Sequence, residues 1–189
     1  MRDKIVSFIA PHTRILDLGC GQGELLEILR DQKKCQCYGI DIDYRNILAC
    51  TERGISAFQG DLDEGLTEFA DQSYDVVVLS QTLQQVHRPL LVIEEMLRVG
   101  KMAVVTFPNF AYWKVRWQLL LGYIPKNEAL PYSWYDTPNI RVISINAFRQ
   151  LCQDKDIEIV QENHESDLPF LDNLLASRGI FLIQKKSYQ

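Results

Sequence analysis

The chain has 189 residues, 47% of them hydrophobic and 24% charged, which fits one globular domain with a substantial core. Its formal net charge of −5 argues against a protein that coats nucleic acid, because such surfaces need clustered positive charge. No run approaches the roughly 20 apolar residues that cross a bilayer, and the N-terminus does not resemble a signal peptide. We therefore expect a single cytoplasmic domain over residues 1–189 that binds neither nucleic acid nor membranes.

The cysteines give no sign of a metal site. There are five of them, an odd number, and no two form a C-x-x-C pair. A disulfide framework or a thiolate zinc site usually shows paired or regularly spaced cysteines. Reduced and mostly buried thiols are the simpler interpretation, and we expect no metal.

Strands and helices alternate along most of the chain. The apolar run at 73–80 is bounded by polar residues, as in a parallel strand buried on both faces. Pro11 stops the first helix and Pro89 opens another. The expected helices lie at 5–10, 24–30, 44–53, 89–99 and 143–152, and the expected strands at 14–18, 37–43, 55–59, 73–80, 101–107, 157–161 and 180–185.

This alternation predicts an α/β fold with right-handed crossovers, a Rossmann-like, doubly wound and mostly parallel sheet of seven strands. Strands 157–161 and 180–185 are expected to close the sheet as an antiparallel pair. Residues 109–141 interrupt the rhythm after the fifth strand with three tryptophans, four tyrosines and three prolines. We interpret this aromatic-rich insertion as a lid or a partner-docking element rather than as core. No element is predicted at 165–178.

The first strand runs into a glycine-rich turn that is suited to holding a ligand. Asp17 precedes three alternating glycines, Gly19, Gly21 and Gly23, with Cys20 between the first two. Glycine allows positive φ and lets a ligand approach the backbone, and the following helix presents its N-terminus. The dinucleotide fingerprint G-x-G-x-x-G has a different spacing, which weakens a nicotinamide interpretation. A tight connection that binds nothing remains the simple alternative.

Two further carboxylates follow the ends of the next strands. Asp41 comes 24 positions after Asp17, and a carboxylate about 20 residues after such a turn meets the ribose of an adenosine ligand. Asp61 ends the third strand in the same way. Ser80 and Gln81 end the fourth strand, so we expect them to line the floor of the same site.

This D-x-G-x-G-x-G turn resembles the first motif of the class I S-adenosylmethionine-dependent methyltransferases. The resemblance implies S-adenosylmethionine as cofactor, with S-adenosylhomocysteine as the product or bound form. It implies that Asp17 and the glycine turn with Cys20 hold the methionine moiety, that Asp41 with Ile42 holds the ribose, and that Asp61 accepts from the adenine amino group beside the Leu62 backbone.

The chain also resembles the MetW family of methionine-biosynthesis proteins. The segments that carry the resemblance lie at 59–66, 79–84, 95–100, 107–110 and 130–140, and the last, LPYSWYDTPNI, is very specific. The stretch after Gln161 departs from the family pattern. The resemblance implies a methyltransferase-like protein that acts beside MetX, the enzyme that acylates homoserine, but it implies no particular methyl acceptor, since fold and reaction are separate inferences.

No clear general base is evident. The candidates for contacting a substrate or partner are His87, Tyr112, Trp113, Tyr135 and Asp136, although a histidine like His87 is more often a solvent-facing loop residue. Three hypotheses stay open. The protein is a methyltransferase with a small-molecule acceptor, or a partner of MetX that responds to S-adenosylmethionine or S-adenosylhomocysteine, or a scaffold that keeps only the fold. The intact glycines and Asp41 count against the scaffold.

Overall fold

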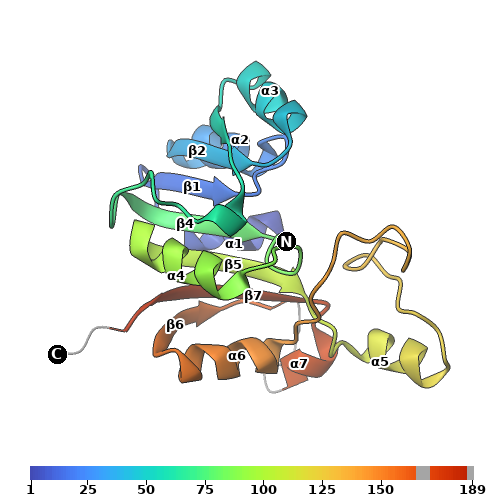
Figure 1. The fold of residues 1–189 in the computed structure, drawn as a ribbon. Helices are drawn as coiled ribbons and strands as arrows, with labels where there is room; N and C mark the ends of the chain where they lie inside the picture. The colour runs from blue at the N-terminus through green and yellow to red at the C-terminus, as the bar shows by residue number, and fades with distance from the viewer. Residues whose placement is uncertain (165–170, 187–189) are drawn as a thin grey trace.

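The structure is a computed structural model that describes residues 1–164 and 171–186. A single seven-stranded sheet organises the molecule (Figure 1). Its strand order is β3-β2-β1-β4-β5-β7-β6, and β7 runs antiparallel to both of its neighbours. The strands are β1 Arg14–Leu18, β2 Gln36–Asp41, β3 Ser56–Gln59, β4 Tyr74–Ser80, β5 Gly100–Pro108, β6 Ile157–Glu162 and β7 Arg178–Lys185.

Helices cover both faces of the sheet. One face packs against α1, α2 and α3, the other against α4 and α6, and each face has its own apolar core. The helices are α1 Arg2–Phe8, α2 Glu24–Lys33, α3 Tyr44–Glu52, α4 Pro89–Val99, α5 Trp113–Leu120, α6 Ile145–Asp154 and α7 Asp172–Leu175, with a 3-10 turn, η1, at Leu62–Glu64. The seven-stranded, doubly wound α/β fold and the antiparallel pair at its C-terminal end are therefore confirmed.

Local chemistry explains most element boundaries. Leu25, Leu26 and Leu29 recur at helical spacing and are buried under α2. Central strand β4 is apolar on both faces because helices cover both. The first helix differs from expectation, because α1 starts at Arg2 and ends at Phe8. Ile9 is already extended, and Pro11 disfavours helical backbone at the residue before it.

The C-terminal region was only partly predictable. The stretch without a predicted element contains α7 at Asp172–Leu175, while 165–170 lies outside the described residues. Within the part of the chain that the structure describes, no helix combines the length and apolar character that crossing a bilayer requires.

The aromatic insertion leaves the body of the protein (Figure 1). After β5 the chain forms α5 and then a long arm, residues 121–144, that returns to α6. Val115 is the buried residue of α5, and Ala129 and Leu130 are buried farther along the arm. Asn127 and Leu130 form an isolated antiparallel bridge through two backbone hydrogen bonds, which closes a tight turn in the arm.

Candidate functional site

A crevice runs along the carboxyl ends of β1, β2 and β4, where open parallel sheets bind their ligands. It has two connected parts, with volumes of about 600 and about 250 Å³, which share Gly19, Ser80 and Gln81 in their walls. Together they are large enough for a small molecule or cofactor. The larger part is lined by Asp41, Ile42, Asp61, Leu62 and His87, and the smaller by Asp17, Cys20, Gly21, Met1 and Arg2, among others.

The glycine turn bends into this crevice. Gly19, Gly21 and Gly23 all have positive φ, between 54° and 79°, which disfavours any side chain there. A Cβ at Gly19 would lie 2.6 Å from Thr82 Oγ1, whereas a Cβ at Gly21 would meet no atom of the other described residues, its chain neighbours apart, within 4 Å. The open space beside Gly21 therefore belongs to the crevice, and a ligand can approach the main chain there.

Asp41 is held in a fixed orientation at the end of β2. Its Oδ1 accepts from the Asp43 backbone at 2.9 Å and from Asn46 Nδ2 at 3.0 Å. Its Oδ2 accepts from the Gly21 backbone at 2.8 Å. Each carboxylate oxygen has two lone-pair sites, so Oδ2 can accept one more donor from the crevice. Asp41 thus ties the glycine turn to β2 and keeps a free acceptor site.

Asp17 has the most unusual environment among the crevice residues. It is only 2% exposed, and its Oδ1 has no hydrogen-bond partner in the described part of the chain. Burial, with a smaller contribution from the negative charge of Asp41, raises the pKa of Asp17 to about 8. An unpartnered buried carboxyl group costs free energy. A cationic ligand group in the smaller part of the crevice would remove that cost.

The wall opposite β2 is built by the end of β4. Gln81 has a φ of 57°, uncommon for a residue with a side chain. Its backbone N–H donates to the Thr106 carbonyl at 3.0 Å, and its side-chain amide donates to Thr106 Oγ1 at 3.1 Å. These bonds to β5 keep Gln81 at the boundary between the two parts of the crevice.

Asp61 and Leu62 lie at the third strand end, as expected. The Asp61 side chain caps η1 by accepting from the Asp63 backbone at 2.9 Å, and Leu62 is buried. Asp63, which we did not single out, accepts from the backbone N–H groups of His87 and Arg88. It therefore fixes the loop that carries His87 to the crevice rim, where the imidazole is exposed.

The remaining candidates lie away from the crevice. Tyr112, Trp113, Tyr135 and Asp136 do not line either of its parts within the described chain. The insertion borders the crevice instead, because the backbone N–H groups of Ile140 and Arg141 both donate to the Gln84 carbonyl. Arg141 Nη2 also donates to the His87 carbonyl at 2.8 Å.

The sequence did not identify several crevice residues. Asn46 and Arg2 are examples: Asn46 holds Asp41, and Arg2 pairs with Glu24 at the mouth of the smaller part. Asn46 lies five positions after Asp41, in the first turn of α3, which was the available signal. Nothing in a single sequence indicated that α1 would bring Arg2 to this edge.

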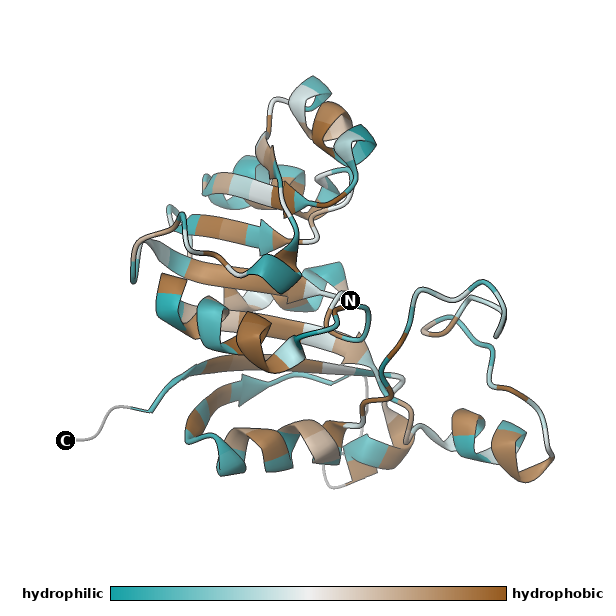
Figure 2. Ribbon diagram, viewed as in Figure 1, coloured by the Kyte–Doolittle hydropathy of each residue, from teal (hydrophilic) through white to brown (hydrophobic). Residues whose placement is uncertain are grey.

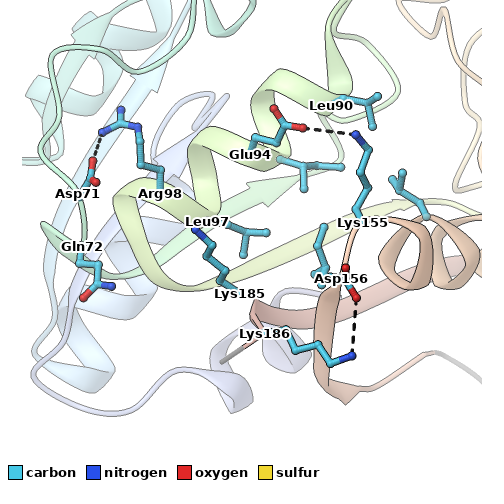
Figure 3. Close-up of a pocket in the computed structure, with 13 residues that line it drawn as sticks. Asp71, Gln72, Leu90, Glu94, Leu97, Arg98, Lys155, Asp156, Lys185 and Lys186 are labelled. Atoms are coloured by element: carbon cyan, nitrogen blue, oxygen red, sulfur yellow. Dashed lines mark hydrogen bonds and ion pairs between the residues drawn. The ribbon is translucent and has the colours of Figure 1, made fainter. Parts of the chain in front are cut away.

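A separate hollow of about 330 Å³ lies between α4 and α6, at the opposite edge of the sheet (Figure 3). Leucine and isoleucine side chains form its floor. Six of its seven charged side chains form ion pairs with each other, Lys155 with Glu94, Lys186 with Asp156, and Arg98 with Asp71, and the seventh is Lys185. We assign it no ligand.

Three potential metal-binding side chains, Glu162, His164 and Asp172, also lie together. Arg149 pairs with both carboxylates. His164 Nδ1 accepts from the Ile180 backbone at 3.1 Å, so its Nε2–H donates to Glu162 at 2.9 Å. Burial opposes the charge of Glu162, but bonds from His164 and Arg149 lower its pKa to about 2. The cluster fastens α6 and α7 to the sheet.

Comparisons with known proteins agree with this architecture. The chain is 35% identical over 170 residues to the bifunctional methionine biosynthesis protein MetXA/MetW of Rhodopirellula baltica. The match covers 85% of this chain and 27% of that protein, so the chain spans about a quarter of its relative.

Solved structures show the fold. An S-adenosylmethionine-dependent methyltransferase from Thermotoga maritima has a TM-score of 0.68 at 19% identity, covering 98% of this chain and 87% of that one. The 4+2 cyclase SpnF also has a TM-score of 0.68, at 18% identity, covering 99% and 81%. At such identities the likeness shows the fold alone. The family described as methionine biosynthesis protein MetW matches residues 2–183, and the chain belongs to that family.

Proposed function

We propose that this protein binds S-adenosylmethionine, or S-adenosylhomocysteine as its product form, in the crevice, and that it works with the homoserine O-acyltransferase MetX in methionine biosynthesis. The observation that carries the ligand proposal is Asp17, which lines the crevice and has a buried oxygen without a hydrogen-bond partner among the described residues. A carboxyl group kept in that position at a cost in free energy suits a site for a cation.

The other crevice residues fit the rest of such a ligand. Asp41 Oδ2 would accept from a ribose hydroxyl, because Gly21 uses only one of its acceptor sites. Ile42 is 66% exposed beside Asp41 and offers apolar surface to a flat ring. Asp61 and the backbone of Leu62 would recognise the edge of the adenine.

When bound, S-adenosylmethionine supplies an activated methyl group, and the protein contributes alignment and exclusion of water. Among the described residues that line the crevice, His87 carries the one imidazole. It would accept a proton from an acceptor that must lose one. A methyltransferase with an unidentified small-molecule acceptor is the first form of the proposal. The cyclase with the same fold shows that the fold alone does not set the reaction.

The second form is a non-catalytic partner that senses S-adenosylmethionine or S-adenosylhomocysteine and regulates MetX. Two observations favour it. The Rhodopirellula relative carries both names, MetXA and MetW, for a single chain, and the insertion exposes many large apolar side chains that a partner could cover. The ligand is an end product of the methionine route and could therefore report its output.

Calorimetric titration with S-adenosylmethionine tests the ligand. Asp41→Ala should weaken binding at least tenfold by removing the ribose acceptor and freeing the glycine turn. Asp156→Ala, at the opposite edge, is the matched control and should bind as the wild type does. Equal affinity of wild type and Asp41→Ala would contradict the placement of the ribose.

Reconstitution with MetX then separates the two forms. Release of S-adenosylhomocysteine with an acceptor from cell extract would support methyl transfer. A change in the rate of MetX on complex formation, without methyl release, would support the regulatory partner. Failure of the two proteins to associate would refute the MetX part of the proposal while leaving ligand binding intact.

A further inference from the structure

The exposed apolar surface of the protein is concentrated in the insertion. Of the 19 large apolar side chains that are exposed within the described chain, 12 lie between residues 113 and 142. Figure 2 shows hydrophobic residues on α5, which stands apart from the body of the molecule. Scattered exposed apolar residues are ordinary, but so many of them in one projecting segment suggest an interaction site.

Three of the four exposed apolar residues of α5 form a stripe on one face, and the fourth, Leu119, lies outside it. Trp113, Trp117 and Leu120 are spaced at i, i+4 and i+7, so they share one side of the helix. They are 45%, 57% and 76% exposed. The opposite side is held by Val115, which is 1% exposed. A helix fixed on one side, with two tryptophans and a leucine on the other, has the anchor pattern of a helix that docks in a partner's groove.

Hydrogen bonds connect α5 to the arm that follows it in the chain. Gln118 Nε2 donates to the Lys126 carbonyl, and Lys126 Nζ donates to Ser133 Oγ. Trp134 and Tyr135, which follow directly, are 72% and 73% exposed and pack edge to face against each other. The arm thus adds a second aromatic pair to the same projecting segment.

The charge of the insertion indicates which kind of partner surface would complement it. The stretch 109–141 contains four basic and two acidic residues, although the whole chain has a net charge of −5. On α5 itself, Lys114 and Arg116 flank the stripe and no residue is acidic. The complementary surface is an apolar groove with an acidic rim. An anionic lipid surface would be repelled by the acidic remainder of the protein.

We propose that this stripe, Trp113, Trp117 and Leu120 with Trp134 and Tyr135, is the surface that docks on MetX, and that its attachment to the crevice rim makes docking depend on the ligand. The inference rests on the proposed function and deepens it. It identifies the surface that contacts MetX and the residues that connect this surface to the crevice.

The route runs through Gln84. The insertion ends at Ile140 and Arg141, whose backbone N–H groups both donate to the Gln84 carbonyl. Gln84 is 3% exposed, and its side-chain amide donates at 2.6 Å to the carbonyl of Gln81, a residue of the crevice wall. Arg141 also bonds to His87 on the rim. A ligand that contacts Gln81 or His87 therefore acts on the residues that position the insertion.

The docking test measures the affinity of MetX from the same organism for three variants. Trp117→Ala and Leu120→Ser should each weaken binding at least tenfold, because central aromatic and apolar anchors dominate such interfaces. Leu48→Ser, at a 47% exposed leucine on α3, is the matched control and should bind MetX as the wild type does. Unchanged affinity for both stripe variants would overturn the assignment.

A different partner of the stripe would give a different result in these binding tests. Binding of the wild type to vesicles of anionic phospholipid that is lost in Trp117→Ala would show a lipid surface. A concentration-dependent dimer that Leu120→Ser dissociates would show a second copy of this chain. Either result, with MetX affinity unchanged, overturns the docking proposal. If the wild type does not bind MetX at all, the MetX part of the proposed function fails together with this docking surface, while ligand binding in the crevice stands.

The linkage test repeats the MetX titration with saturating S-adenosylhomocysteine. We expect a change in affinity of about fivefold or more in the wild type, within the range of common allosteric couplings. Arg141→Ala should still bind MetX, because the stripe is intact, but should lose most of the ligand effect. An identical ligand effect in Arg141→Ala, or none in the wild type, would refute the linkage.

Discussion

Replacing Asp17 by asparagine should stabilise the ligand-free protein while weakening ligand binding. The carboxyl group is 2% exposed and one of its oxygens lacks a partner among the described residues. Burial, and then the charge of Asp41, raises its pKa from 3.8 to about 8. The folded state therefore holds a proton that the unfolded chain releases, so the wild type loses stability as the pH rises from about 4 to about 8.

The size of this loss of stability follows from the difference between the pKa of Asp17 in the unfolded chain and its pKa in the folded protein. A pH of 7 lies about three units above the pKa of Asp17 in the unfolded chain, and each unit is worth about 1.4 kcal/mol. The protonated Asp17 therefore lowers the stability of the wild type at pH 7 by at most about 4 kcal/mol. The amide keeps some unsatisfied polar atoms, so we expect Asp17→Asn to add about 1 to 3 kcal/mol. For a chain of this size that corresponds to a rise in Tm of roughly 3 to 10 °C.

Thermal unfolding of both proteins at pH 4 and pH 8 measures this. The difference in Tm should be near zero at pH 4 and largest at pH 8. The matched control is Asp75→Asn, because Asp75 accepts from the Arg14 backbone and from Lys101, and these contacts lower its pKa. That change should lower Tm at pH 8. A Tm for Asp17→Asn that is unchanged or lower at pH 8 would refute the reasoning.

Four other outcomes are expected. Binding of S-adenosylmethionine at pH 7 should release a proton from Asp17, seen as a dependence of the calorimetric heat on the buffer's ionisation enthalpy; a buffer-independent heat would contradict this. Arg149→Ala should lower the unfolding free energy by about 2 to 4 kcal/mol in urea denaturation at pH 7, by removing the cation that Glu162 and Asp172 share. In the wild type the contribution of Glu162, whose pKa is lowered to about 2, should be lost as the pH falls below about 4.5; stability unchanged in that window would contradict it. Gly39→Ala should destabilise by about 1 to 3 kcal/mol, because its Cβ would lie 2.5 Å from Cys20 Sγ; an unaltered Tm would disprove that clash.

Several parts of the site were not accessible from the sequence. The partners of Asp41, namely Asn46 and the Gly21 backbone, depend on how α3 and the glycine turn meet. The left-handed backbone of Gln81 carries no sequence signal, since glycine is the usual residue there. Arg2 reaches the crevice only because α1 packs under the sheet.

The sequence by itself determined the seven strands and five of the helices, because burial imposes a period on apolar residues and glycine and proline mark the turns. It also placed Asp17, Asp41 and Asp61 at one edge, since parallel strands end together. Only the tertiary structure decided that Asp17 is buried with one oxygen that has no hydrogen-bond partner among the described residues, and that the insertion borders the crevice while its tryptophans face solvent. Both depend on contacts between residues far apart in the chain, such as Ile140 with Gln84, which no local pattern encodes.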